Sequence, residues 1–98
     1  GLVRALASDL AQYGIMINLV CPGITDTEML DKVICQRAEQ MGLTPAQVRE
    51  DMRRKTPDGR LGKCSDVAAA VLFLVARETE HINGQILTVD GGRSLNLV

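Results

Sequence analysis

The stretch Ile15-Met-Ile-Asn-Leu-Val-Cys-Pro-Gly-Ile-Thr-Asp-Thr27 decides the fold of this chain. Its first part, Ile15–Cys21, is apolar except for Asn18, and β-branched side chains are spread through it. A continuous apolar run that stops at Pro22-Gly23 is typical of a strand that is buried on both faces of a sheet. The run therefore predicts a strand over Ile15–Cys21 that needs neighbouring strands and covering helices.

The end of this strand carries the candidate site. Pro22 cannot extend a β-ladder, and Gly23 allows the backbone to approach a ligand closely. Ligands of open α/β sheets bind in the crevice outside the carboxyl ends of the strands, and here two hydroxyl groups follow, at Thr25 and Thr27. The pattern indicates one wall of a cofactor or substrate site. A simple turn that ends the strand is the alternative that the same residues allow.

Apolar spacing and capping residues predict the other elements. Helices are expected over residues 1–13, 28–41, 44–55 and 65–77, and a second strand over 85–89. Gly14 and Gly42 are helix stops, Thr44 is an N-cap that precedes Pro45, and Ser65 is the cap of the last helix. Strands that are joined by helices run parallel through a right-handed crossover. The chain is therefore predicted to be α/β.

Several helix faces are predicted to be apolar. On the 28–41 helix one side carries Met29, Leu30, Val33, Ile34 and Met41. On the 44–55 helix Val48 and Met52 face one way, whereas Arg49, Glu50, Arg53 and Arg54 are expected to face water. The run Val67–Ala76 is apolar all round, which predicts burial on more than one side.

Composition excludes several classes of function. The chain has 98 residues, one domain at most, and its 11 basic and 12 acidic side chains give a net charge of -1, so no nucleic-acid partner is expected. The cysteines Cys21, Cys35 and Cys64 are odd in number and far apart, which predicts reduced thiols in a cytoplasmic protein and no metal site. The longest apolar run, Val67–Ala76, is too short to span a bilayer, so no membrane role is expected.

Three stretches, taken in order, resemble the short-chain dehydrogenase/reductase family. The segment from Asn18 to Thr27 is similar to the family's strand and Pro-Gly loop. Before it, Gly1–Gly14 resembles the helix that carries the catalytic Tyr-x-x-x-Lys motif. After it come Gly59-Arg-Leu-Gly62, Asp66-Val-Ala-Ala69 and Gly84-Gln-Ile-Leu-Thr-Val-Asp-Gly-Gly92.

The resemblance implies a fold, a cofactor and a set of site residues. The chain would be the C-terminal portion of a Rossmann-like doubly wound parallel sheet, a single NAD(P)-binding domain, with two strands and covering helices. By position, NAD or NADP would contact Pro22, Gly23, Ile24, Thr25 and Thr27. Residues 28–55 would form the substrate lid, with Met29 and Leu30 lining the pocket for a small alcohol or ketone. Relatives assemble through Val67–Ala76 and strand 85–89, which implies a homo-oligomer, a dimer or a tetramer.

The family's catalytic apparatus is not found in this sequence. No Gly-x-Gly-x-x-Gly turn occurs, and Tyr13 is followed four residues later by Ile17 instead of lysine. The resemblance therefore implies an oxidoreductase that interconverts a secondary alcohol and a ketone, of which this chain is the C-terminal part. No catalytic residue can be assigned, and the chain alone is expected to be inactive. A non-catalytic remnant or interaction module that keeps the oligomer-forming helices is the alternative.

Overall fold

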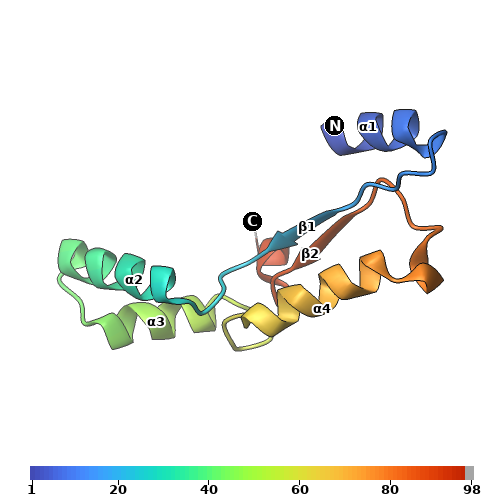
Figure 1. Cartoon of the computed structure of the whole chain (residues 1–98). Coiled ribbons are helices and arrows are strands. Elements are labelled where there is room, and N and C mark those ends of the chain that lie inside the picture. Colours follow the sequence, from blue (N-terminus) through green and yellow to red (C-terminus); the bar gives the residue numbers. More distant parts are fainter. Residues whose placement is uncertain (97–98) are drawn as a thin grey trace. The chain divides into compact units, whose positions relative to one another are not determined.

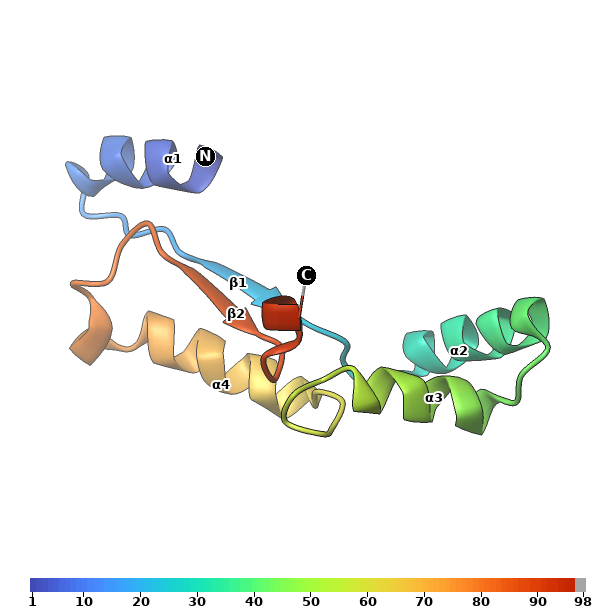
Figure 2. The ribbon, with the colours of Figure 1, turned by 180° about the vertical axis from the view of Figure 1, so that it is seen from behind.

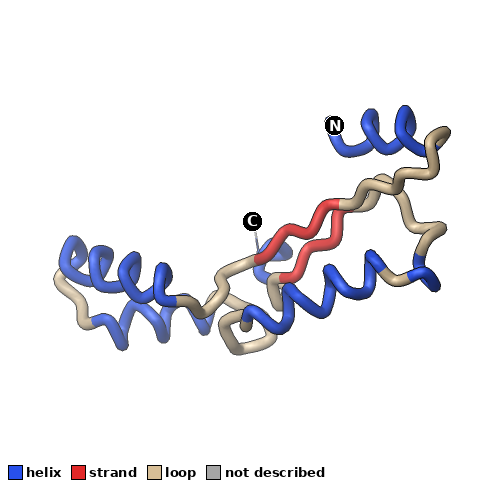
Figure 3. Tube along the Cα trace, in the orientation of Figure 1, coloured by secondary structure: helices blue, strands red, loops and turns tan. Residues whose placement is uncertain are grey.

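The computed structural model describes residues 1–96 and has the predicted α/β class (Figure 1; Figure 3). The main elements are α1 (Leu2–Ala11), β1 (Leu19–Pro22), α2 (Glu28–Met41), α3 (Pro45–Arg54), α4 (Cys64–Val75) and β2 (Ile86–Val89). Short 3-10 helices lie at Arg77–Thr79, between α4 and β2, and at Arg93–Asn96, after β2. The residues divide into two compact units: the strand unit, Gly1–Cys21 with Ser65–Val89, and the hairpin unit, Pro22–Cys64 with the segment from Asp90 onward.

The strand unit contains a two-stranded sheet in which β1 and β2 lie side by side (Figure 2). The Gly84 N–H donates to the Ile17 carbonyl at 2.8 Å, and the Leu19 N–H donates to the Gln85 carbonyl at 2.8 Å. Because these bonds advance along both segments in the same direction, the strands are parallel, as the sequence predicts.

The regular part of β1 begins at Leu19, four residues later than predicted from the apolar run that starts at Ile15. Ahead of it, side-chain amides take the place of ladder bonds. The Ile17 N–H donates to Asn83 Oδ1 at 3.0 Å, and Asn18 both donates to the Ile82 carbonyl at 3.1 Å and accepts from the Gln85 N–H at 3.0 Å. The two segments are thus tied together before the backbone ladder starts.

Helix α1 approaches the sheet through small residues. Ala7 is buried, and a Cβ built on Gly84 would lie 3.3 Å from the Ala7 Cβ. Asn83 Nδ2 donates to the Ala7 carbonyl at 3.3 Å. The Asn83-Gly84 turn, which leads into β2, therefore contacts α1, the helix that precedes β1.

Helix α4 corrects two predictions. It begins at Cys64, so Ser65 lies within the helix instead of capping it. None of its residues is buried, and Leu72, Phe73 and Val75 are 68%, 53% and 72% exposed. The predicted burial of Val67–Ala76 on more than one side is wrong for this chain, because two strands offer too little surface to cover a helix that is apolar all round.

The hairpin unit contains α2 and α3, which pack against each other (Figure 1). Helix α2 ends as predicted at Gly42, which adopts the left-handed conformation (φ 67°), and its N–H bonds the carbonyls of Ala38 and Glu39. Helix α3 begins with a capping box in which Thr44 and Gln47 satisfy each other's backbone N–H groups. Sequence therefore placed the helix ends of this unit correctly.

The core of the hairpin unit is a cluster of four buried side chains: Ile34, Ala38, Val48 and Met52. Ile24, Leu30 and Leu61 pack against it. The predicted face of α2 is partly wrong, because Met29 is 76% and Met41 is 59% exposed. The buried side instead follows four-residue steps through Leu30, Ile34 and Ala38.

Candidate functional site

The predicted cofactor residues form a loop in the hairpin unit that runs from the end of β1 to the start of α2. Pro22 is the last residue of β1 and is exposed. A Cβ built on Gly23 would lie 2.5 Å from the Asp90 Cβ and 2.8 Å from the Asp90 Cα. Only glycine fits this contact. The absence of a side chain at Gly23 allows the close approach of Asp90. The approach of a ligand to Gly23 stays a prediction.

A second segment holds the middle of the loop. Thr25 forms an isolated parallel bridge with Gly62. The Gly62 N–H donates to the Ile24 carbonyl at 2.8 Å, and the Asp26 N–H donates to the Gly62 carbonyl at 2.8 Å. The Gly59-Arg-Leu-Gly62 motif therefore fixes the backbone of the loop through an isolated parallel bridge.

The two predicted threonines keep complementary hydrogen-bonding capacity. Thr25 Oγ1 donates to the Gly23 carbonyl at 3.3 Å, which leaves its oxygen able to accept. Thr27 is the N-cap of α2, and its Oγ1 accepts from the Leu30 N–H at 3.2 Å, which leaves its hydroxyl hydrogen able to donate. Each hydroxyl group can therefore form one further hydrogen bond to a ligand: Thr25 can accept one, and Thr27 can donate one. The Ile24 side chain, by contrast, packs against the core cluster.

The Asp90-Gly91-Gly92 turn supports Gly23 from the other side. Asp90 accepts hydrogen bonds from the Ser94 N–H at 2.8 Å and the Gly92 N–H at 3.0 Å. These bonds, with Ser94 contributing most, hold the pKa of the Asp90 carboxyl below its ordinary value. Next along the chain, Arg93 Nη1 donates to the Met52 carbonyl at 3.1 Å, near the C-terminus of α3. The turn is therefore fixed to both the loop and α3.

The carboxylate of the loop, Asp26, is held by a guanidinium from α3. Arg49 Nη1 lies 2.9 Å from Asp26 Oδ1, and Arg49 Nη2 lies 2.5 Å from Asp31 Oδ1 of α2. The hydrogen bond to Asp26 is the main cause that raises the pKa of Arg49. The guanidinium of Arg49 is partly exposed, as predicted, but it also joins the loop, α2 and α3, which the sequence did not indicate. Its spacing along the sequence gave no signal of this pairing.

The predicted substrate residues behave differently from each other. The side chain of Met29 is 76% exposed at the first turn of α2, whereas Leu30 is half-buried against the core cluster. Met29 is therefore available to line a pocket. Leu30 stabilises the packing of α2.

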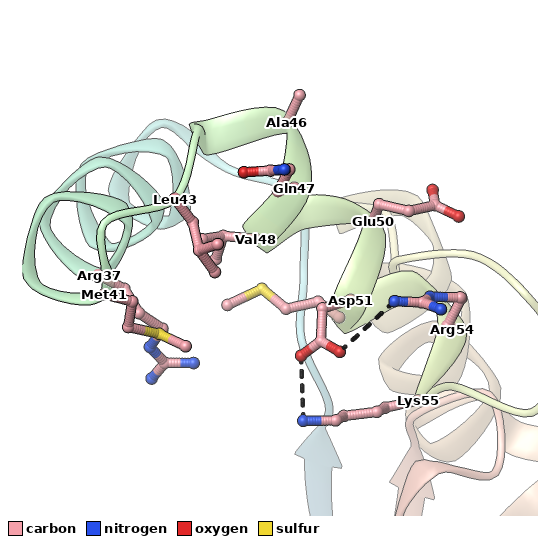
Figure 4. A pocket seen from close by; sticks show the side chains of 11 residues that line it. Arg37, Met41, Leu43, Ala46, Gln47, Val48, Glu50, Asp51, Arg54 and Lys55 are labelled. Atoms are coloured by element: carbon pink, nitrogen blue, oxygen red, sulfur yellow. Dashed lines mark ion pairs between the residues drawn. The ribbon is translucent and has the colours of Figure 1, made fainter.

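An open groove of about 890 Å³ is lined by the C-terminal end of α2, by Leu43 and by α3 (Figure 4). Its lining includes Met41, Leu43, Val48 and Met52, with charged side chains at its margin. Asp51 Oδ2 lies 3.0 Å from Lys55 Nζ, and Asp51 Oδ1 lies 4.0 Å from Arg54 Nη2. The dashed lines in Figure 4 mark these two ion pairs. None of the predicted cofactor or substrate residues lines this groove, and sequence analysis did not predict it.

Among the described residues 1–96, no group of three or more His, Cys, Asp or Glu side chains is arranged to hold a metal ion. The helices of the same residues all lack the length and apolar character needed to cross a lipid bilayer.

The parallel strands, their connecting helices and the loop at the strand end define the chain as part of a Rossmann-like α/β structure. A family model described as enoyl-(acyl carrier protein) reductase matches residues 1–94. The chain belongs to the short-chain dehydrogenase/reductase family. It matches the C-terminal part of its relatives.

Individual relatives agree with this assignment. The chain is 36% identical over 92 residues to a diacetyl reductase ((S)-acetoin forming) of Staphylococcus aureus. The matched region covers 94% of this chain and 36% of that protein. A short chain dehydrogenase family protein from Francisella tularensis has a TM-score of 0.90 at 28% identity, covering 97% of this chain and 39% of that one. Actinorhodin polyketide ketoreductase with NADPH has a TM-score of 0.86 at 30% identity, covering 95% and 36%. The chain thus spans about a third of the length of the curated relatives that it matches.

Proposed function

We propose that this chain supplies the nicotinamide side of an NAD(P)-dependent oxidoreductase that interconverts a secondary alcohol and a ketone. The observation that carries the proposal is the loop at the end of β1, which Asp90 and Gly62 fix in place and which presents Thr25 and Thr27. One named relative is a diacetyl reductase, and one structural neighbour is a ketoreductase with NADPH. The general oxidoreductase character of the family supports the same conclusion.

The chemistry of the loop suits a carboxamide. A nicotinamide carboxamide has a carbonyl acceptor and an NH₂ donor, so it needs one partner of each kind. Thr27 retains a hydroxyl hydrogen to donate, and Thr25 retains oxygen lone pairs to accept. Pro22, Gly23 and Ile24 would contribute backbone surface at the strand end. The cofactor, when bound, supplies the hydride.

The remaining parts of the site are assigned by the same proposal. Residues 28–55 form the substrate lid, and Met29, with its exposed side chain, lines the pocket of a small alcohol or ketone together with Leu30. The proton donor and the pyrophosphate-binding turn would come from residues of the parent protein other than those of this sequence, in which neither motif occurs. The free thiols of Cys21, Cys35 and Cys64 support a cytoplasmic location.

The apolar side chains of α4 that this chain leaves uncovered need further partners, and we propose that a second copy of the parent protein supplies part of that cover in a homo-oligomer. Leu72, Phe73 and Val75 are each more than half exposed, which is unusual for large apolar residues on one helix. A second copy of the parent protein would cover part of this helix and β2. The same observation favours the second candidate function, a non-catalytic interaction module, which would need this surface but not the loop.

An exchange of segments tests the proposal. Residues 1–94 of this chain would replace the matching segment of the Staphylococcus aureus diacetyl reductase, and turnover of diacetyl with NADH and with NADPH would be followed by nicotinamide absorbance. We expect the chimera to be active. Thr25→Val should raise its KM for the cofactor about two- to tenfold, the effect of one hydrogen bond. Ser8→Ala, which removes an exposed hydroxyl group on α1 outside the loop, should not. An inactive but folded chimera would favour the interaction module.

A further inference from the structure

Arg49 forms the centre of a three-residue ion network, Arg49 with Asp26 and Asp31, called here the Arg49 clamp. Its two terminal nitrogens reach different carboxylates, Asp26 of the loop at 2.9 Å and Asp31 of α2 at 2.5 Å. Arg49 itself belongs to α3. One guanidinium therefore connects three segments of the hairpin unit, and its planar fork fixes their relative positions better than a single point charge could.

The position of Asp26 gives the clamp a route to the proposed cofactor site. Asp26 lies between Thr25 and Thr27, and its N–H donates to the Gly62 carbonyl at 2.8 Å. The Asp31 N–H donates to the Thr27 carbonyl at 3.1 Å. Arg49 therefore binds two carboxylates that are linked to the threonines: Asp26 is the sequence neighbour of both, and the Asp31 backbone is hydrogen-bonded to Thr27. A shift of α3 that carries Arg49 with it would pull on the loop at these points.

We propose that Arg49 is a positioning residue that couples the α2–α3 hairpin to the loop Gly23–Thr27, so that placement of the lid and cofactor affinity are linked. The link to cofactor affinity rests on the proposed function. The mechanical coupling between the hairpin and the loop rests on the ion pairs of Arg49 alone. Linkage of this kind is reciprocal: whatever orders the loop also favours the clamped hairpin.

The other ion pairs of α3 do not have this arrangement. Arg53 pairs with Glu50, and Arg54 lies 4.0 Å from Asp51, so their partners belong to the same helix. Removal of Arg49 has a further consequence, because it leaves Asp26 and Asp31 as two neighbouring carboxylates without the cation between them. Arg54→Met is therefore the matched control for Arg49→Met: the same side chain is lost from the same helix, but no tie between segments is broken.

The first arm of the test measures amide hydrogen exchange in the chain itself, at the N–H groups of Asp26 and Leu30. The Asp26 N–H donates to the Gly62 carbonyl, and the Leu30 N–H donates to Thr27 Oγ1. The clamp is partly exposed, with 37% for Arg49 and 52% for Asp26, so the effect should be moderate. We expect Arg49→Met to speed exchange at both amides about three- to tenfold, and Arg49→Lys to have an intermediate effect. Arg54→Met should leave both rates within about twofold.

The second arm measures kinetics in the chimera described above. Arg49→Met should raise the KM for the cofactor and the KM for the ketone together, with kcat per folded site changed less. A merely structural role would lower the amount of folded enzyme and leave both KM values unchanged, which would overturn the proposal. Equal exchange rates in Arg49→Met and Arg54→Met would also overturn it. Absence of nicotinamide-dependent turnover in the unmodified chimera would instead contradict the proposed function, and the exchange arm would still decide the coupling.

Discussion

Gly23 and Asp90 approach each other so closely that no side chain fits between them: a Cβ on Gly23 would lie 2.5 Å from the Asp90 Cβ. The two residues come at the carboxyl ends of β1 and β2, and both belong to the hairpin unit. Gly23 is not among the glycines with positive φ. The requirement for glycine here is therefore steric, not conformational.

This contact predicts the effect of Gly23→Ala. The methyl group meets the Cα and Cβ of Asp90, which cannot rotate away, so backbone must shift. We expect a loss of about 1–3 kcal/mol in the free energy of unfolding, measured by urea denaturation. Gly1→Ala adds the same methyl group where nothing lies within 4 Å, so it should cost only the small difference between glycine and alanine at the N-cap of α1, about 0.5 kcal/mol. An unchanged stability of Gly23→Ala would show that the turn at Asp90 is not held against the loop.

Met52 and Met29 provide a matched pair on the hairpin unit. Met52 is 4% exposed in the core cluster, so Met52→Ala should cost about 2–4 kcal/mol of unfolding free energy. Met29 is 76% exposed, so Met29→Ala should change stability by less than about 0.5 kcal/mol. In the chimera, Met29→Ala should raise the KM for the ketone while Tm stays constant. A KM that does not change would remove Met29 from the proposed pocket.

Asp90 predicts an acid-dependent loss of stability. Its carboxyl has an ordinary pKa of 3.8, which hydrogen bonds from Ser94 and Gly92 lower in the folded chain. A lowered pKa means that the charged form stabilises the fold, fully above about pH 5, and that this contribution is lost as pH falls through 3.8 and then through the folded pKa. Asp90→Asn should therefore be less stable at neutral pH and lose less stability between about pH 5 and pH 3. Thermal unfolding across this range is the measurement, with Asp9→Asn on exposed α1 as the control.

The exposed face of α4 predicts the assembly state of the parent protein. Ala69→Glu places a charge on this apolar helix, where Ala69 is exposed, and Leu72→Glu does so at a position that is 68% exposed. Both should shift the parent towards monomer in sedimentation experiments, because a buried unpaired carboxylate opposes association. Gln36→Glu adds the same charge on exposed α2 and should leave the oligomer intact. An oligomer that survives both α4 changes would exclude this surface from the interface.

The chain alone is expected to show no dehydrogenase activity. It carries the proposed nicotinamide side of the site, but no glycine-rich turn for the pyrophosphate and no Tyr-x-x-x-Lys motif occur in its sequence. Incubation of the purified chain with NADH or NADPH and a panel of small ketones should give the absorbance change of buffer alone. Turnover above that rate would mean that the chemistry resides in residues that we have not assigned.

The sequence predicted local features well because short-range chemistry controls them. The bounds of α2, its stop at Gly42 and the capping of α3 by Thr44 all depend on residues within four positions of one another. The start of β1 was predicted too early, since an apolar run cannot reveal that Asn18 and Asn83 replace ladder bonds with side-chain bonds. The burial of α4 was predicted wrongly because burial depends on covering layers that this chain does not provide.

The sequence by itself determined the α/β class, the order of its elements and the loop at Pro22–Thr27, because apolar periodicity and turn residues act along the chain. Only the tertiary structure decided what each loop residue does. It set Gly23 against Asp90, Thr25 beside Gly62, and Arg49 between Asp26 and Asp31. These partners are 18 or more positions apart in the sequence, and such distant pairings arise only when strand pairing and helix packing bring separate segments together.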